Sequence, residues 1–259
     1  MKGLKYILIA CLAPLAWACD TIDSDDRYIE MEPVNPQRAV LIEEFTGQNC
    51  TNCPDGHAAI AKLVEQYGDA VVPVCIHAGR LSDPTGFDKY QGLAIPDGEV
   101  YYKEAGSPNI PCAVIDGVGE PLLWSEWADA VRVQLAKPSP ADIDVKASFS
   151  EGKINITAKI LAAKDLSCRL QVWLVENGIV TYQQDHNDFR LDYVHNHVLR
   201  GVVNGVNGQE IALKNNVYAD YSFAVEPQEK WNVGNMAAVV FIENADGVQQ
   251  AAQAKVLID

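Results

Sequence analysis

The chain has 259 residues, 48% of them hydrophobic, and a formal net charge of −15. This length and apolar content allow one or two folded domains, each with a buried core. The negative charge argues against nucleic acid as a partner and against direct binding to anionic lipid surfaces.

The first residues carry the pattern of an export signal. Residues 1–18 combine a short basic start with an apolar stretch that is too short to span a bilayer. The small residues before Cys19 resemble the lipobox of bacterial lipoproteins, which implies cleavage before Cys19 and attachment of lipid to it. An ordinary signal peptide cut after Ala18 is the alternative. Residues 19–36 are acidic and predict a solvated tether.

The most informative stretch is residues 39–54, where an apolar run leads into the pair Cys50 and Cys53. From Gly56 to Tyr67 the apolar residues recur on one face of a helix. Two thiols at the start of a helix lie where free N–H groups and the helix dipole favour a thiolate. A thiolate attacks disulfides or binds a soft metal, so this stretch predicts redox or metal chemistry.

The remainder of the first half predicts further elements of a mixed α/β domain. They are, in order, a strand at 70–76, a long loop at 81–107 with a short helix at 98–105, a strand at 112–115 and a helix at 124–135. Pro73 lacks an N–H, so the strand that contains it is expected at a sheet edge. A loop as long as the one at 81–107 is typical of a lid or a binding segment.

This order of elements resembles the thioredoxin fold. In that family a cis-proline precedes the strand that faces the CxxC, and Pro111 occupies the matching place. The resemblance implies a thioredoxin-like domain at 37–138, with Cys50 as an exposed nucleophile and Cys53 as a buried resolving thiol. The sequence departs from the family at Asn49, where many of those oxidoreductases have tryptophan.

One histidine could assist the two cysteines. His77 ends the strand at 70–76 on the side where the CxxC is expected. It could tune a thiolate, or it could bind a metal together with Cys50 and Cys53, which is a minor alternative. No organic cofactor is predicted.

Two further residues are auxiliary candidates. Cys112, beside the proline, could be a further resolving thiol or a buried small residue. Glu43 or Glu44 could point inward and accept a proton from Cys53, as a buried acid does in thioredoxins. The alternative for the two acids is a solvated pair.

The second half has a different pattern. After Pro138 and Pro140, apolar and polar residues alternate between Asn-Gly and Asp-Gly turns. The expected strands lie at 143–149, 154–160, 170–174, 193–199, 217–225, 236–242 and 248–258. They predict an all-β, immunoglobulin-like sandwich over 139–259, so that the fold class is an α/β thioredoxin-like domain followed by this sandwich. His195 and His197 share a strand face, and packing or hydrogen bonding explains them better than a metal.

Three motifs in order carry a closer resemblance. TGQNCTNCP at 46–54, Ile-His-Ala-Gly at 76–79 and YVHNHVLR at 193–200 resemble the Omp28-related lipoproteins of Bacteroidetes. The resemblance implies an outer-membrane lipoprotein, held by lipid on Cys19 at the periplasmic face or the cell surface. It also implies a thioredoxin-like part and a β-sandwich, in a family whose founding member is described as a surface receptor or adhesin.

Three functional hypotheses follow from these patterns. The first is thiol–disulfide exchange on envelope proteins by Cys50 and Cys53, with Pro111 beside them. The second is a receptor or adhesin that binds an envelope or surface protein, in which the cysteine pair is a structural disulfide. The third is metal capture by Cys50, Cys53 and His77. Nucleic acid is not an expected partner.

Overall fold

The computed structural model describes residues 37–82 and 90–258. The predicted signal peptide, Cys19 and the acidic tether lie outside the described residues, as does part of the long loop predicted at 81–107. Among the described helices, none is long and apolar enough to cross a membrane.

The elements of the first half follow the predicted order. They are β1 (Val40–Thr46), α1 (Cys53–Tyr67), η2 (Gly68–Ala70), β2 (Val71–His77), η3 (Arg80–Ser82), α2 (Pro96–Glu104), β3 (Cys112–Ile115), β4 (Val118–Leu122) and α3 (Trp127–Leu135). The sequence analysis predicted every α-helix and strand of this set except β4, but not the short helical turns η2 and η3. The sequence of β4 holds Gly119 and Pro121, two residue types that are depleted in strands.

The second half consists of strands and one short turn of helix. They are β5 (Ala141–Ser150), β6 (Lys153–Ala162), β7 (Leu166–Glu176), β8 (Ile179–Asp185), β9 (Asp188–His195), β10 (Val198–Val202), β11 (Gln209–Leu213), β12 (Tyr218–Val225), η4 (Val233–Asn235), β13 (Met236–Asn244) and β14 (Gly247–Ile258). The strand predicted at 193–199 is divided into β9 and β10, because His197 adopts a positive φ of 57°. β8 and β11 were not predicted.

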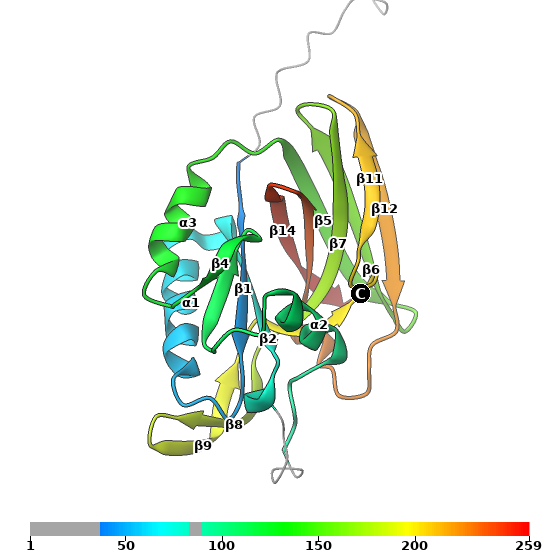
Figure 1. Cartoon of the computed structure of the whole chain (residues 1–259). Coiled ribbons are helices and arrows are strands. Elements are labelled where there is room, and N and C mark those ends of the chain that lie inside the picture. The colour runs from blue at the N-terminus through cyan, green and yellow to red at the C-terminus, as the bar shows by residue number, and fades with distance from the viewer. Residues whose placement is uncertain (1–36, 83–89, 259) are drawn as a thin grey trace, which may run out of the picture. The chain divides into compact units, whose positions relative to one another are not determined.

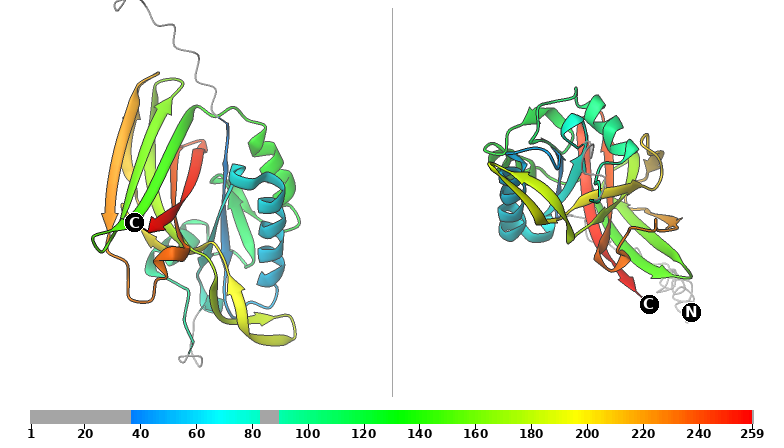
Figure 2. Two further views of the ribbon diagram at one scale, coloured as in Figure 1. Left: turned by 180° about the vertical axis from the view of Figure 1, so that it is seen from behind. Right: turned by 90° about the horizontal axis from the view of Figure 1, so that it is seen from below.

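Within the described residues, twelve strands form one mixed sheet that includes strands from both halves (Figure 1). β2 runs parallel to β1, and β3 runs antiparallel to β1. α1 and α3 lie on one face of these strands, where the side chains of Val40, Ile42, Ile60, Leu63, Trp127 and Val131 form one core cluster (Figures 1 and 2). α2 packs on the opposite face, through Tyr101.

The predicted fold class is wrong, because the α/β part is not a separate thioredoxin-like domain joined to an immunoglobulin-like sandwich. β10 pairs with β2 on one side and with β7 on the other, and so makes the sheet continuous across both halves. The core is shared as well: the indole N–H of Trp173 donates to the hydroxyl of Tyr101 across 3.2 Å, and Trp173 packs edge-on against Phe241. The alternation of residues predicts strands, but it does not predict which strands pair over long separations.

The edge position predicted for the strand of Pro73 is also wrong. β2 lies between β1 and β10, but β10 pairs with it only from Cys75 onward, through the bond from the Cys75 N–H to the carbonyl of His197. Since β10 does not reach Pro73, the missing N–H of that proline breaks no hydrogen bond between these strands.

Two buried polar clamps join the beginning of the folded chain to its end. Arg38 forms an ion pair with Asp116 and donates to the carbonyls of Val248 and Gln249 in β14. The side-chain oxygen of Gln250 accepts a hydrogen bond from the N–H of Ala39, and its side-chain nitrogen donates to the carbonyls of Gln37 and Ala141. Each clamp links residues more than 200 positions apart, so the two halves of the sequence fold as one compact unit.

β8 and β9 form a hairpin outside the large sheet. It lies at the N-terminal end of α1, beside the turn that leads from β1 into that helix (Figures 1 and 2). This placement brings residues 179–195 to the cysteine pair.

Candidate functional site

Cys50 and Cys53 form a disulfide at the first turn of α1. Pro54 follows at the start of the helix, where its missing N–H breaks no helical hydrogen bond. Both cysteines are buried, with 3% of Cys50 and none of Cys53 exposed. The position at a helix start agrees with the sequence analysis, but the expected exposure of Cys50 does not.

The burial of the disulfide is explained by the β8–β9 hairpin, which covers the loop before α1. The side-chain amide of Gln183 donates to the carbonyls of Cys50 (2.9 Å) and Gly47 (3.2 Å). The backbone N–H groups of Gln184 and His186 donate to the carbonyls of Gln48 and Thr51, each across 2.8 Å. The hairpin therefore binds this loop much as one strand binds another.

Pro111 lies where the sequence analysis expected it, beside the start of the helix. The Ile110–Pro111 peptide bond is cis. A Cβ atom added to Gly56, in the first turn of α1, would lie 3.3 Å from the Cβ of Pro111 and 2.7 Å from a carboxyl oxygen of Glu44. Gly56 thus allows the proline and the acid to approach α1 closely.

A cluster of polar side chains is buried beneath this turn. The carboxyl group of Glu44 is fully buried, with the Cys75 thiol as a weak donor beside it and His57 Nε2 3.8 Å from one of its oxygens. The His57 ring lies between Thr46 and Tyr193, with its Nε2 3.0 Å from Thr46 Oγ1 and its Nδ1 2.8 Å from the Tyr193 hydroxyl. Tyr193 belongs to β9, so this contact also fixes the hairpin to α1.

Two more histidines extend the cluster. The rings of His77 and His195 lie with their centroids 5.4 Å apart, and the His57 ring lies 6.0 Å from that of His195. Neither ring nitrogen of His77 has a hydrogen-bond partner among the described residues. A buried imidazole without an acceptor favours the neutral form.

Burial shifts the proton affinities of these groups strongly. Burial, and then the nearby His195 and His197, lower the pKa of His57 to about 3, and burial lowers that of His195 to about 4. Burial raises the pKa of Glu44 to about 8, against the opposing effect of the Cys75 hydrogen bond. At neutral pH the cluster therefore holds uncharged histidines and a protonated carboxyl group.

These pKa shifts make the free energy of unfolding depend on pH in two opposite ways. The pKa values of the buried histidines lie below the ordinary 6.5, so the unfolded chain binds more protons than the folded chain between about pH 4 and 6.5. Stability therefore increases with pH in that range. The raised pKa of Glu44 acts oppositely, since the folded state retains its proton, and it lowers stability as pH rises from 4.5 to about 8.

The other predicted auxiliary residues lie away from the disulfide. Glu43 lies on the opposite face of β1 from Glu44, where burial, and then Glu243 and Asp116, raise its pKa to about 8. Cys112 is buried in the cluster that holds Phe45, on the face away from α1. The acid that faces the helix is thus Glu44, and Cys112 has the surroundings of a packed core residue.

The metal hypothesis has no preformed site in this oxidised chain. Cys50 and Cys53 are joined to each other, so neither offers a thiolate. Within residues 37–82 and 90–258, no group of three or more His, Cys, Asp or Glu side chains is arranged to hold a metal ion. Capture of a metal by Cys50, Cys53 and His77 would require the reduced form, and it stays a prediction.

Sequence reasoning missed the residues that cover the disulfide. Gln183 and Tyr193 lie on the hairpin, more than 130 positions from the groups they bind. The local sequence offers one signal, His57, which lies one turn after Cys53.

Comparison with known proteins agrees with the motifs. The family model described as outer membrane protein Omp28 matches residues 98–258, more than half of the chain. The chain belongs to the Omp28 family. The expected location, a lipid anchor at the outer membrane, is confirmed by this membership. No curated protein matches the chain.

Solved structures with low sequence identity share the fold of this chain. HBP35 of Porphyromonas gingivalis is 15% identical, with a TM-score of 0.69 over 85% of this chain and 76% of its own. A protein from Agrobacterium tumefaciens is 16% identical, with a TM-score of 0.52 over 84% and 95%. A domain of the outer membrane lipoprotein Omp28 from P. gingivalis is 26% identical over 47% of this chain and 91% of its own, with a TM-score of 0.33. The first two show the fold alone.

Proposed function

We propose that this Omp28-family lipoprotein is a binding protein of the cell envelope, in which Cys50–Cys53 is a structural disulfide. The observation that carries this proposal is the cover over the disulfide: Gln183 donates to the carbonyl of Cys50, and neither cysteine is more than 3% exposed. Exchange requires a thiolate to reach a sulfur atom, and a covered disulfide prevents that approach.

We propose that the disulfide fixes the conformation of the turn at residues 47–51, to which the β8–β9 hairpin is hydrogen-bonded. The bond closes a loop with a sequence separation of only 3. For so short a loop the chain-entropy model gives a stabilisation of about 2 kcal/mol. With the disulfide in place, the carbonyls of residues 47–51 are fixed in positions where β8 can bind them.

The test is a double substitution, Cys50→Ser with Cys53→Ser. We expect the free energy of unfolding to fall by about 2 kcal/mol, with no redox phenotype in cells that carry the variant. Cys168→Ser serves as the control, since Cys168 is a free, buried cysteine in another core cluster. A redox defect in the double variant but not in the control would contradict the proposal.

Thiol–disulfide exchange is the second candidate, because one observation favours it. Glu44 lies under the first turn of α1 with its pKa raised to about 8, so it can take or give a proton near neutral pH. In that mechanism reduced Cys50 attacks a target disulfide and forms a mixed disulfide. Cys53 then displaces the target as a dithiol, and the protein is left oxidised.

This second candidate requires the hairpin to move away from Cys50. Turnover of insulin disulfides with dithiothreitol as reductant tests it. Exchange would be favoured over the structural role if the wild-type protein catalyses this reaction, Cys50→Ser abolishes the catalysis, and Glu44→Gln changes its pH profile. No turnover above the rate of dithiothreitol alone supports the structural role.

A further inference from the structure

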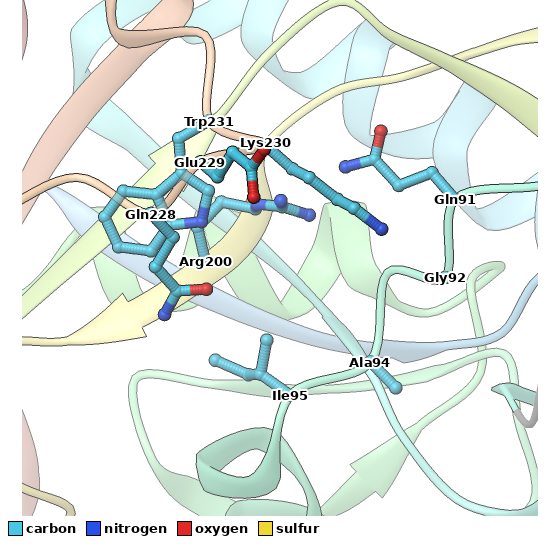
Figure 3. Close-up of a pocket in the computed structure, with 9 residues that line it drawn as sticks. All are labelled: Gln91, Gly92, Ala94, Ile95, Arg200, Gln228, Glu229, Lys230 and Trp231. Atoms are coloured by element: carbon cyan, nitrogen blue, oxygen red, sulfur yellow. The ribbon is translucent and has the colours of Figure 1, made fainter.

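A cavity of about 240 Å³ lies between the segment that leads into α2 and the loop after β12. Residues 91–95 form one wall and residues 228–231 the other, while Arg200 of β10 lies at the back (Figure 3). Its size suits a ligand smaller than most drugs, since typical small-molecule pockets span roughly 300–1,000 Å³.

The cationic group at the back of the cavity is buried and held in place. Arg200 is only 6% exposed, and its Nε lies 3.1 Å from a carboxyl oxygen of Glu176. The other oxygen of Glu176 accepts the N–H of Asn232, so the carboxylate is itself fixed. No described residue accepts a hydrogen bond from the two terminal nitrogens of Arg200. That edge of the guanidinium group is available to a ligand.

Two neighbouring side chains complete a site for an anion with an apolar body. Lys230 has no ion-pair partner among the described residues, and Figure 3 shows its ammonium group in the same space as the guanidinium group of Arg200. The indole of Trp231 lies over Gly201, where an added Cβ would be only 3.1 Å from the ring. The glycine therefore allows the ring to form a flat, apolar wall.

The charges select the kind of anion. Arg200 and Lys230 supply two positive charges, and Glu229 together with Glu176, which pairs with Arg200, supplies two negative charges. Because these charges balance, a monoanion costs less to bury here than a dianion. The planar fork of an arginine matches the two oxygens of a carboxylate.

We propose that this cavity binds a small organic carboxylate, with the carboxylate on Arg200 and Lys230 and the apolar body against Trp231. The proposal rests on the proposed function, because it names the ligand class of the binding protein. It does not depend on the disulfide.

The experiment uses the oxidised full chain and benzoate as the probe, with binding followed by calorimetry. We expect benzoate to bind, and benzamide, its uncharged analogue, to bind at least about tenfold more weakly. Lys230→Gln is expected to weaken benzoate to a similar extent, whereas Lys164→Gln, an exposed lysine elsewhere, leaves it unchanged. Phthalate, a dianion of the same ring, is expected to bind more weakly than benzoate.

Arg200→Gln would leave Glu176 buried without its cation, so the variant is combined with Glu176→Gln. This double variant is expected to lose benzoate binding while keeping the cooperative unfolding transition. No benzoate binding, equal binding of benzamide, or full binding by both Lys230→Gln and the double variant would overturn the carboxylate site. If dithiothreitol reduces the disulfide only slowly in that case, the structural role of Cys50–Cys53 stands and only the ligand class fails.

Discussion

The side-chain amide of Gln183 forms the hydrogen bonds that attach the β8–β9 hairpin to the turn around the disulfide. The substitution Gln183→Ala removes them. The residue is fully buried in β8, and its amide reaches the carbonyls of both Cys50 and Gly47. The carbonyl of Gly47 also accepts the N–H of Cys50, so it keeps one partner after the substitution. The carbonyl of Cys50 loses the donor described above.

The cost can be worked from these contacts. A buried carbonyl left without its donor costs about 1–3 kcal/mol. The Oε1 atom of Gln183 has no partner in the native state, so its removal relieves part of that cost. We therefore expect a net loss of about 2 kcal/mol, concentrated in the contact between the hairpin and the turn before α1. Since about 1.4 kcal/mol corresponds to a tenfold change in an equilibrium constant, the open form of the hairpin becomes roughly 30 times more populated.

The assay measures how fast dithiothreitol reduces the native protein, with new thiols trapped by a maleimide and located by peptide mass spectrometry. The wild-type disulfide should react slowly and Gln183→Ala about 30 times faster, if reduction proceeds through the open hairpin. Gln184→Ala is the matched control, because its amide binds only the exposed carbonyls of His186 and Asp188. Equal reduction rates in the wild type and Gln183→Ala would refute the idea that the hairpin protects the disulfide.

Three further predictions concern stability. Arg38→Met leaves Asp116 buried without its cation and should lower the free energy of unfolding by about 3–5 kcal/mol in urea titrations. Gly247→Ala should cost about 2–3 kcal/mol, because φ is +96° and the new Cβ would collide with the carbonyl of Asp116; Gly152→Ala, with open space around it, should cost about 1 kcal/mol. Stability should be greatest near pH 6.5, where the effect of the buried histidines ends and that of Glu44 continues, and Glu44→Gln should reduce the decline between pH 6.5 and 8. A decline that is unchanged in Glu44→Gln would contradict this assignment.

The sequence predicted the local elements well where one periodicity dominated. The apolar face of residues 56–67 predicted α1, and the run at 112–115 predicted β3 with its bounds. Pairing across long separations was not accessible in the same way. Nothing in Val198 or Cys75 indicates that β10 adds to the edge of β2, because an apolar strand fits any buried position in a sheet.

The candidate site was also predicted only in part, because its residues come from segments far apart in the sequence. Cys50, Cys53 and Pro111 were found from their spacing and order, and the structure brings Pro111 beside the helix that starts at Cys53. The choice between Glu43 and Glu44 stayed open, because β1 is buried on both faces and its apolar run has no alternation from which a face can be read.

The reduction potential of the Cys50–Cys53 pair tests the central claim most directly, since it compares the disulfide with its dithiol in the folded protein. A structural disulfide gives a value below about −300 mV, and that is the result expected here. A value between about −270 and −120 mV, the range of exchange catalysts, would contradict a structural role for this pair.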